Sequence, residues 1–363
     1  MQELPSMNPT RIAIVGCGGF VGVHLVKQML DLGYPVDGWD LEDRRLGELV
    51  GHKDFCFHHS DYSAPETIDD ISKNHSVVIH LAALCNPSLY NTEDQRVIQS
   101  NFILPARLAE ACAKEGSWLV YFSTSEVYGR TVSGVARGMG IEVGESNELD
   151  LLTEDSSPLL LGAIGSRRWN YACAKQLMER YLLALEVSSQ LQWTVVRPFN
   201  FLGPEMDFIP GVDGEGVPRV MACFMDALLH GRSMELVDGG GARRCFTWIG
   251  DAIDGIIKIL ENPQASRGQC FNIGNPKNET DICGLAARMA GIYTQITGRD
   301  LPNPVWKNVS AESFYGPGYQ DSDRRLPNVG KARALLGWEP RMTLDDTLRL
   351  TIDWFVQHYP VSH

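Results

Sequence analysis

Ile12-Ala-Ile-Val-Gly-Cys-Gly-Gly-Phe-Val-Gly-Val23 is the stretch of this chain that decides its fold. The apolar run before the glycines predicts a buried strand over residues 11–15, and the pattern after them predicts an amphipathic helix over residues 21–32. Gly16-x-x-Gly19-x-x-Gly22 at this junction is typical of a dinucleotide-binding turn, where a helix N-terminus faces a pyrophosphate. An ordinary strand–turn–helix unit can carry the same glycines, but the flanking strand and helix favour the dinucleotide site.

Strand-like and helix-like segments continue to alternate after this unit. We expect strands over residues 36–40, 77–83, 119–123 and 193–197, and helices over residues 101–115 and around Tyr171. This alternation predicts an α/β fold, a Rossmann-type doubly wound parallel sheet with a smaller C-terminal substrate lobe. Residues 245–274 are expected to return to the main sheet and residues 344–355 to form a closing helix. Residues 129–167 and 306–327 read as loops.

Composition narrows the class of protein. The 363 residues are 44% hydrophobic and carry a net charge of -13, which argues against nucleic acid as a partner. The N-terminus shows no basic start followed by a long apolar run, and no apolar stretch approaches the ~18 residues of a membrane span. The nine cysteines form no C-x-x-C pair. We therefore expect a cytoplasmic protein with reduced thiols, no disulfide framework, no metal site and no membrane partner.

The residues after the second predicted strand bear on the choice of cofactor. Asp40 ends this strand, where a carboxylate binds ribose hydroxyls and repels a 2′-phosphate, so NAD is favoured over NADP. Arg44 and Arg45 follow and could accept a 2′-phosphate, although a solvated surface pair is the preferred interpretation. Asp61, after the next strand, is either an adenine contact or a surface carboxylate.

Tyr171-Ala-Cys-Ala-Lys175 is the second informative motif. Residues four apart lie on one face of a helix, and an ammonium near a phenol favours the phenolate. A phenol of lowered pKa is a general base for an alcohol or sugar hydroxyl. Alone this pair would be two ordinary helix residues. Together with the glycine fingerprint it indicates a site that passes a hydride to a nicotinamide.

Further motifs carry a resemblance to a known family. His80-Leu-Ala-Ala83, Ser123-Thr-Ser-Glu-Val-Tyr-Gly129 and Arg197-Pro-Phe-Asn200, with the two motifs above, resemble the extended short-chain dehydrogenase/reductase family over almost the whole chain. Within it, residues 169–177, 206–211, 216–220 and 315–325 look like the UDP-glucuronate decarboxylase subgroup. That subgroup includes the plant UDP-apiose/UDP-xylose synthases and the decarboxylase domain of the bacterial bifunctional polymyxin-resistance enzyme. The resemblance implies a UDP-glucuronic acid substrate and tightly held NAD.

The resemblance, read with the motifs, also implies roles for individual residues. Catalytic roles fall to Cys85, Thr124, Ser125, Glu126, Tyr171, Lys175 and Arg325. NAD contacts fall to Gly16, Gly19, Phe20, Val21, Gly22, Asp40, Asp61, Leu81, Ala82, Ala83, Asn101, Tyr171, Lys175 and Pro198. UDP-sugar contacts fall to Tyr90, Asn200, Arg219, Arg244, Tyr319 and Arg325. Residues 1–199 and 244–275 would form the NAD-binding domain, and residues 200–243 and 276–363 the UDP-sugar-binding lobe.

Ordinary structural roles compete with three of these assignments. Glu126 could be a helix-capping or structural carboxylate, Arg325 a surface ion-pair residue, and Cys85 a buried small hydrophobe. The chain also departs from the family pattern at Glu205, where an arginine is usual, and at Ser125, where the apiose synthases carry a cysteine. Cys85 matches their other characteristic cysteine.

The activity implied by the resemblance leaves alternatives open. The 4-keto intermediate could be released, reduced to UDP-xylose or rearranged to UDP-apiose. A UDP-glucuronate 4-epimerase would use Tyr171 and NAD in the same way without losing carbon dioxide. A nucleotide-binding regulator without turnover is disfavoured because Tyr171, Lys175 and Thr124 are all present.

The resemblance further implies a homodimer, because the family pairs through two helices of each subunit. The helix over residues 175–185 carries Leu177, Leu182 and Leu183, more apolar residues than a single buried face requires. We therefore expect these leucines at the dimer contact.

Overall fold

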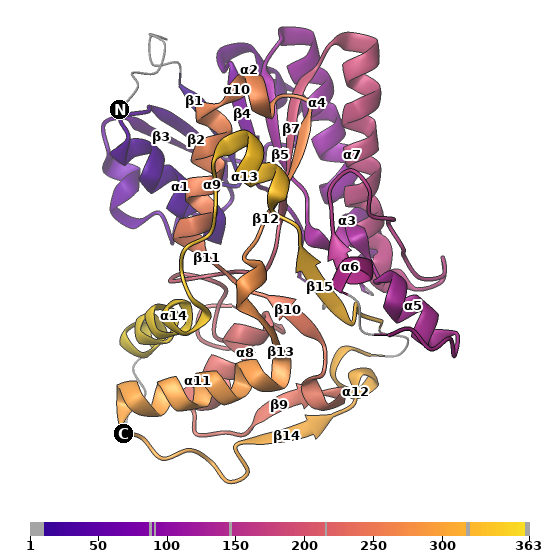
Figure 1. Ribbon diagram of the computed structural model, residues 1–363. Coiled ribbons are helices and arrows are strands. Elements are labelled where there is room, and N and C mark those ends of the chain that lie inside the picture. The colour runs from indigo at the N-terminus through magenta and orange to yellow at the C-terminus, as the bar shows by residue number, and fades with distance from the viewer. Residues whose placement is uncertain are drawn as a thin grey trace.

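The computed structural model describes residues 11–86, 89–90, 92–144, 147–214, 216–316 and 320–359. Its centre is a seven-stranded sheet in the order β12-β7-β5-β4-β1-β2-β3, in which every neighbouring pair is parallel (Figure 1). The predicted Rossmann-type fold is thereby confirmed. The strands are β1 (Ile12–Val15), β2 (Val36–Asp40), β3 (Phe55–His59), β4 (Val77–His80), β5 (Trp118–Phe122), β7 (Gln192–Pro198) and β12 (Gln269–Ile273).

Helices cover both faces of this sheet, which explains why its strands are apolar on both sides. In β1, Ala13 and Val15 pack in the layer that contains α2, α4 and α7, whereas Ile12 and Ile14 pack in the layer that contains α1, α9 and α13. The helices of these two layers are α1 (Phe20–Asp31), α2 (Pro65–Asn74), α4 (Leu104–Glu115), α7 (Asn170–Ser189), α9 (Ile249–Glu261) and α13 (Gly330–Leu336).

Smaller sheets and further helices lie beyond the carboxyl ends of the main strands, in the lower part of Figure 1. A four-stranded sheet has the order β13-β10-β15-β6, and β8 pairs with β11 as β9 does with β14. The strands are β6 (Leu151–Leu152), β8 (Phe201–Leu202), β9 (Met234–Val237), β10 (Arg243–Cys245), β11 (Thr247–Trp248), β13 (Glu279–Asp281), β14 (Trp306–Val309) and β15 (Arg324–Pro327). The helices there are α3 (Asp94–Ile98), α5 (Val132–Gly138), α6 (Asn147–Asp150), α8 (Val220–Leu229), α11 (Ile282–Thr297), α12 (Ala311–Tyr315) and α14 (Leu344–His358). The short helix α10 (Pro263–Ser266) instead follows α9 and lies in the upper part of Figure 1.

Short helical turns complete the chain path. Gln99–Ile103 is a π-helical segment that leads into α4, so the helix predicted over residues 101–115 begins in a wider turn. The single 3₁₀ turns are Gly47–Gly51, Ser125–Tyr128, Arg167–Trp169, Asp238–Gly240 and Pro276–Asn278. Among the described residues, no helix is long and apolar enough to cross a membrane.

Three local predictions were wrong. The strand expected over residues 77–83 ends at His80. Residues 129–167 are not a continuous loop, because they contain α5, α6 and β6. Residues 306–327 likewise contain β14, α12 and β15. Strand β15 is held between β10 and β6, and pairing with strands so distant in sequence leaves no periodic signal in such a short segment.

One of the leucines expected at a dimer contact lies elsewhere. Leu182 is fully buried between α7 and the main sheet, where it packs in the same layer as Met178 and Leu191. The helix needs this residue to cover the sheet. Leu177 and Leu183, by contrast, are each 49% exposed.

Candidate active site

The glycine turn lies where the strand order of the sheet reverses. In the sheet, β1 lies between β2 on one side and β4 on the other, so the chain order reverses at β1. The crevice at such a switch point is where α/β folds bind ligands. Gly16 has a φ of +91°, and a Cβ on it would lie 2.5 Å from the backbone nitrogen of Ala82. A Cβ on Gly22 would lie 2.3 Å from the Gly16 carbonyl oxygen. The turn thus packs directly against the segment after β4, which contains the predicted cofactor residues Leu81, Ala82 and Ala83.

Asp40 holds the other side of this cradle. Its carboxylate accepts hydrogen bonds from the backbone nitrogens of Gly18 (2.8 Å), Leu41 (2.7 Å) and Glu42 (3.2 Å). A Cβ on Gly18 would lie 2.0 Å from the Glu42 carbonyl oxygen, so the turn needs a third glycine that the fingerprint spacing did not single out. The concave backbone surface and the carboxylate beside it fit the pyrophosphate and ribose of a dinucleotide.

Arg44 is a surface residue with a side chain 47% exposed, as preferred from the sequence, whereas Arg45 is partly buried, and both side chains are held by hydrogen bonds. Arg44 donates to the Asp213 carbonyl oxygen, and Arg45 donates to the carbonyl oxygens of Glu205 and Asp207. Both side chains reach a loop about 160 residues further along the chain, which no local pattern could reveal. Asp61 is exposed and accepts a hydrogen bond from the backbone nitrogen of Ser63, and its adenine contact stays a prediction.

Tyr171 lies in the first turn of α7, and Lys175 lies one turn further on. The Lys175 Nζ donates to the carbonyl oxygen of Phe122 at 2.8 Å, which fixes the helix against the end of β5. Thr124 follows this strand, and its hydroxyl is close enough to the Tyr171 phenol to lower the phenol pKa. The structure thus brings the predicted Tyr, Lys and Thr together at one edge of the sheet.

A buried ion pair also holds α7 against the main sheet. Glu179, one turn after Lys175, accepts hydrogen bonds from Arg197 at 3.1 and 2.6 Å and from the Ser123 hydroxyl at 2.5 Å. Arg197 belongs to β7 and Ser123 follows β5. The helix that presents Tyr171 is therefore tied to two neighbouring strands.

The electrostatics of Tyr171 differ from the expectation. Burial raises the pKa of its phenol well above 10, with added repulsion from Cys85 and Glu126, and this outweighs the hydrogen bond from Thr124 and the charge of Arg168. Burial also lowers the pKa of Lys175 to about 7, against the attraction of Cys85 and Glu179. The Lys175 Nζ lies 6.0 Å from the centre of the Tyr171 ring, so its direct influence on the phenol is limited.

A cluster of acids and arginines lies beside Tyr171. Glu126 pairs with Arg168 (2.7 Å) and more loosely with Arg325 (3.6 Å). Asp321 pairs with Arg244 (2.8 Å), Arg325 (3.1 Å) and Arg168 (3.7 Å). The three arginine side chains are each at most 8% exposed. Among the described residues, three guanidinium groups thus face two carboxylates in this cluster.

The arginines keep both carboxylates ionised. Burial alone would raise the pKa of Glu126, but Arg168 and Arg325 outweigh it and lower the pKa below its ordinary value. Burial would likewise raise the pKa of Asp321, but Arg244, Arg325 and Arg168 lower it strongly. Each carboxylate therefore stabilises the fold above its ordinary pKa, and this contribution is lost as the pH falls through the lowered value.

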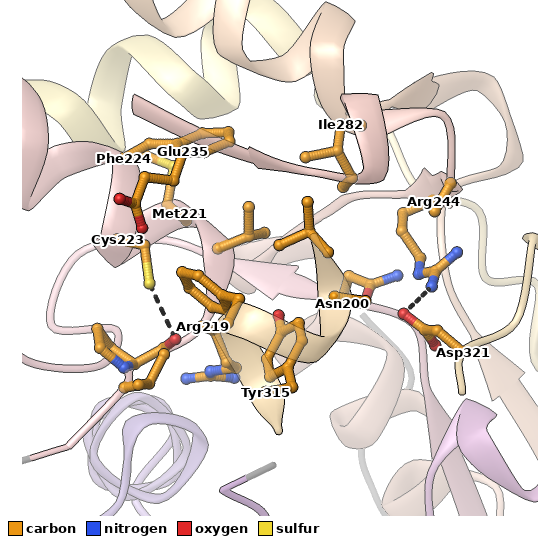
Figure 2. A pocket seen from close by; sticks show the side chains of 18 of the residues that line it. Asn200, Arg219, Met221, Cys223, Phe224, Glu235, Arg244, Ile282, Tyr315 and Asp321 are labelled. Atoms are coloured by element: carbon orange, nitrogen blue, oxygen red, sulfur yellow. Dashed lines mark hydrogen bonds and ion pairs between the residues drawn. The ribbon is translucent and has the colours of Figure 1, made fainter. Parts of the chain in front are cut away.

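These groups line a cleft of about 1030 Å³ between the main sheet and the smaller sheets. Figure 2 shows Arg244 bonded to Asp321 on one side of the cleft and Arg219 on another, with Asn200 and Tyr315 between them. The cleft is also lined by the predicted Cys85, Glu126 and Arg325. Six predicted catalytic or substrate residues therefore share one cavity.

The remaining predicted residues differ in their surroundings. Tyr90 stacks on Tyr171 with ring centres 5.1 Å apart. Ser125 is buried in the turn after Thr124. Asn101 is fully buried and donates to the carbonyl oxygens of Leu84 and Val97. Gly19, Phe20 and Val21 begin α1 and Pro198 ends β7, whereas Tyr319 lies outside the described residues.

The structure bears differently on the three structural alternatives raised by the sequence. Thr124, not Glu126, caps the 3₁₀ turn, whereas the ion pair of the Glu126 carboxylate with Arg168 is compatible with a structural role. Arg325 is 5% exposed and is no surface residue. Cys85 is exposed and faces the cleft, so it is not a buried hydrophobe.

Sequence reasoning missed Arg168 and Asp321. Arg168 lies three residues before Tyr171, in a turn that leads directly into α7, and this spacing could have indicated that both face the same site. Asp321 comes from a segment that showed no periodicity. Its link to Arg168 joins positions 153 residues apart, and only the folded chain reveals it.

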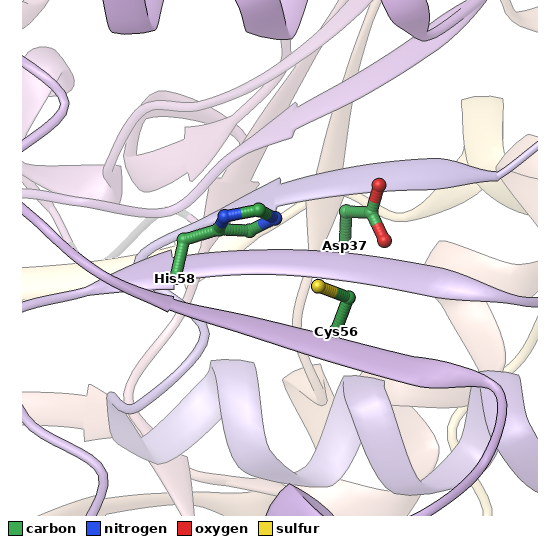
Figure 3. A group of neighbouring side chains, drawn as sticks. All are labelled: Asp37, Cys56 and His58. Carbon is green, nitrogen blue, oxygen red and sulfur yellow. The ribbon is translucent and has the colours of Figure 1, made fainter.

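A group of possible metal ligands lies on the outer strands of the sheet. Atoms of Asp37, Cys56 and His58 lie within 4.8 Å of one another, and Figure 3 shows the His58 ring pointing toward Asp37. The Asp37 carboxylate already contacts Arg11 at 2.5 Å and His75 at 3.0 Å. The neighbouring guanidinium opposes a second cation at this carboxylate. We assign no metal to the group.

Comparison with known proteins agrees with this geometry. Residues 12–274 match the model of the NAD dependent epimerase/dehydratase family. The chain is 40% identical to the UDP-D-apiose/UDP-D-xylose synthase of Oryza sativa subsp. japonica, covering 95% of this chain and 89% of the relative. It is 38% identical to UDP-D-apiose/UDP-D-xylose synthase 1 of Arabidopsis thaliana, covering 96% and 92%.

A solved structure is also similar over nearly the full length. The PbgP3 protein from Burkholderia pseudomallei superposes with a TM-score of 0.82 at 31% identity and covers 97% of both chains. The matched span contains the glycine cradle, Asp40 and the Tyr171–Lys175 pair. The chain therefore belongs to the NAD dependent epimerase/dehydratase family, within the extended short-chain dehydrogenases/reductases.

Proposed function

We propose that the protein is an NAD-dependent decarboxylase of UDP-glucuronic acid that works through a 4-keto intermediate and forms a UDP-pentose. The observation that carries this proposal is the buried cluster of Arg168, Arg244 and Arg325 beside Tyr171. Arg168, Arg244 and Arg325 line the cleft and fit the carboxylate of a sugar, while Tyr171, whose phenol is close to Glu126 and Arg168, fits a sugar hydroxyl. The curated relatives at 38–40% identity are named for UDP-apiose and UDP-xylose synthesis.

The cofactor fits the described cradle. Gly16, Gly18 and Gly22 let the backbone of the turn pack closely, which the pyrophosphate-binding turn of a dinucleotide site requires, and Asp40 supplies the carboxylate for a ribose. NAD, when bound, accepts a hydride from the sugar and can return it. In the proposal, residues 1–199 and 244–275 hold NAD, and residues 200–243 and 276–363 hold the UDP-sugar.

Tyr171 exchanges the proton of the sugar 4-hydroxyl, and Thr124 holds this hydroxyl by hydrogen bonding. The buried phenol needs added positive charge to ionise, because burial raises its pKa. Lys175 supports this role through its place one turn behind Tyr171, where its Nζ holds the Phe122 carbonyl. The anchor formed by Glu179 keeps the phenol in place during the exchange.

Arg325 and Arg168 bind the sugar carboxylate. The Arg325 Nε is buried and has no hydrogen-bond partner in the described part of the chain, so this donor is available to an anion. Oxidation at C4 makes the carboxylate a β-keto acid, and the ketone accepts the electron pair that carbon dioxide leaves behind. A second carboxylate among the same arginines raises the pKa of Glu126, since like charges favour protonation. Glu126 then takes up a proton that can pass to C5.

The UDP-glucuronate 4-epimerase alternative differs from this proposal in one product. An epimerase keeps the carboxylate, whereas the proposed enzyme releases one carbon dioxide for each sugar turned over. Incubation with UDP-glucuronic acid labelled at C6, followed by trapping of labelled carbon dioxide, decides between them. Formation of an epimer without labelled carbon dioxide would reject decarboxylation, and the absence of any turnover would favour a nucleotide-binding regulator.

We extend the proposal to a homodimer in the cytoplasm that pairs through α4 and α7. Leu177, Leu183 and Val187 are exposed on α7 at 49%, 49% and 88%. Light scattering at micromolar concentration should give about twice the 40.3 kDa of one chain, and Leu183→Asp should lower this mass because a charge is costly in an apolar contact. A wild-type mass near 40.3 kDa would exclude the dimer.

Tyr171→Phe should leave folding and NAD content intact but lower the rate of NADH formation by ~10²–10⁴-fold, the usual size of general acid–base catalysis. The ring keeps its stacking with Tyr90, and only the proton-exchanging oxygen is lost. Absorbance at the NADH wavelength in a single turnover measures the effect. A rate near that of the wild type would show that another group is the base.

Arg325→Ala and Glu126→Gln should reduce carbon dioxide release by ~10²-fold or more, as loss of a preorganised charged group does in a desolvated site, while UDP affinity changes little. Arg219→Ala should instead raise the KM for UDP-glucuronic acid with kcat retained, because it removes binding shared by ground and transition states. The trapping assay and UDP titration separate the two effects. Normal carbon dioxide release from Arg325→Ala would reduce Arg325 to an ion-pair residue.

The product should be UDP-4-keto-pentose, UDP-xylose or both, with UDP-apiose minor. Ring contraction needs a base near the sugar, and a thiol with a pKa near ~8.5 provides thiolate that the hydroxyl of Ser125 cannot match. Ser125→Cys should therefore increase the share of UDP-apiose, which NMR of the product mixture measures. Mostly UDP-apiose, or its cyclic phosphate breakdown product, from the wild type would contradict this expectation.

A further inference from the structure

Two arginines after β2 tie a loop of the second lobe to the cofactor side of the molecule. We call residues 205–213 the crossing loop. Arg44 donates to the Asp213 carbonyl oxygen at 2.7 Å, and its other terminal nitrogen lies 3.4 Å from the Asp213 carboxylate. Arg45 donates through Nε to the Glu205 carbonyl oxygen at 3.0 Å and through Nη2 to the Asp207 carbonyl oxygen at 2.7 Å.

The two carbonyls that Arg45 binds belong to residues in an unfavourable conformation. Glu205 and Asp207 have φ values of +64° and +60°, in the left-handed region that side chains with a Cβ disfavour. Such a conformation persists only where its surroundings hold it. A guanidinium presents its donors as a rigid planar fork, so the two bonds of Arg45 fix both carbonyls relative to each other.

Asp207 in turn binds both the backbone and the side chain of Arg219. Its carboxylate accepts hydrogen bonds from the backbone nitrogen of Arg219 at 2.6 Å and from its Nε at 3.1 Å. Arg219 is the N-cap residue of α8, and its guanidinium lies 5.7 Å from the centre of the Phe20 ring, at the start of α1. The main chain and the side chain of this cleft arginine are therefore both set by one carboxylate.

We propose that Arg45 is a positioning residue for nucleotide-sugar binding. It holds the left-handed turn from Glu205 to Asp207, and Asp207 in turn aims Arg219 into the cleft. This inference rests on the proposed function, in which Arg219 is a contact of the UDP-sugar. Arg45 touches neither the reacting sugar nor Tyr171, so it acts on substrate affinity rather than on the chemical step.

Arg44 provides a matched control. It binds the other end of the crossing loop, where Asp213 has further partners: its carboxylate accepts from the Ile209 backbone nitrogen at 2.8 Å and from the Tyr359 hydroxyl at 2.8 Å. Asp213 has no left-handed φ. Removal of Arg44 therefore leaves the loop end held, whereas removal of Arg45 releases both strained carbonyls.

The test measures the affinity of the NAD-loaded enzyme for UDP by calorimetry, together with the KM and kcat for UDP-glucuronic acid. Arg45→Ala should weaken UDP binding by about 5- to 30-fold, within the range of couplings between contacting groups, and raise the KM with kcat retained. Arg45→Lys, which lacks the fork, should fall between Arg45→Ala and the wild type. Arg44→Ala should bind UDP like the wild type.

A double-mutant cycle tests the route through Asp207. If Arg45 acts through this residue, Arg45→Ala combined with Asp207→Ala weakens UDP binding no more than Asp207→Ala alone. Fully additive effects would overturn the route, and so would equal UDP affinity of Arg45→Ala and Arg44→Ala. A fall in kcat at unchanged KM would also overturn the proposal.

Two further measurements keep the outcomes apart. The amount of NAD that each variant releases on denaturation and the midpoint of its thermal unfolding show whether it is folded. If Arg45→Ala does not fold, the same UDP titration of Arg45→Lys decides. A wild type that binds UDP but releases no carbon dioxide would reject the decarboxylase and leave this inference standing. If folded Arg45→Lys and Arg45→Ala bind UDP as tightly as the wild type does, only the role of Arg45 is rejected.

Discussion

The close approach of backbone at Gly16 is the constraint on which the rest of the structure depends. A side chain there would collide with the main chain of Ala82, and one at Gly22 would collide with Gly16 itself. Without these side chains, β1, α1 and the segment after β4 meet at the point where the sheet reverses its order. The cradle for the dinucleotide is thus made mainly of backbone, and Asp40 adds its one charged group.

Charge pairing determines the arrangement of the arginines and carboxylates that line the cleft. Buried ions are costly unless each is paired, and Glu126 and Asp321 share their partners among Arg168, Arg244 and Arg325. Within the described part of the chain the Arg325 Nε is a buried donor without a partner, so an entering carboxylate can accept a hydrogen bond there. The same cluster that stabilises the fold is therefore suited to bind a uronic acid. In the proposed function, the nearness of Glu126 and Arg168 to Tyr171 joins oxidation of the sugar to loss of its carboxylate.

Contacts between distant parts of the chain fix both Arg219 and the helix that carries Tyr171. Arg45 follows Asp40 by five residues and reaches the loop that fixes Arg219. On the other side, Lys175 and Glu179 fasten α7 to the ends of β5 and β7. The position of Arg219, a proposed substrate contact, is therefore linked by hydrogen bonds to the segment after β2.

The sequence by itself determined the fold class and the core of the site. The glycine spacing, the apolar strands and the four-residue separation of Tyr171 and Lys175 are local patterns, and local geometry suffices to interpret them. The sequence did not reveal that Arg168 pairs with Asp321 or that Arg44 and Arg45 bind the crossing loop. It also did not reveal that Leu182 is buried against the sheet. It also gave the wrong direction for the pKa of Tyr171. Partners, burial and desolvation arise between segments far apart in the chain, so only the tertiary structure decided them.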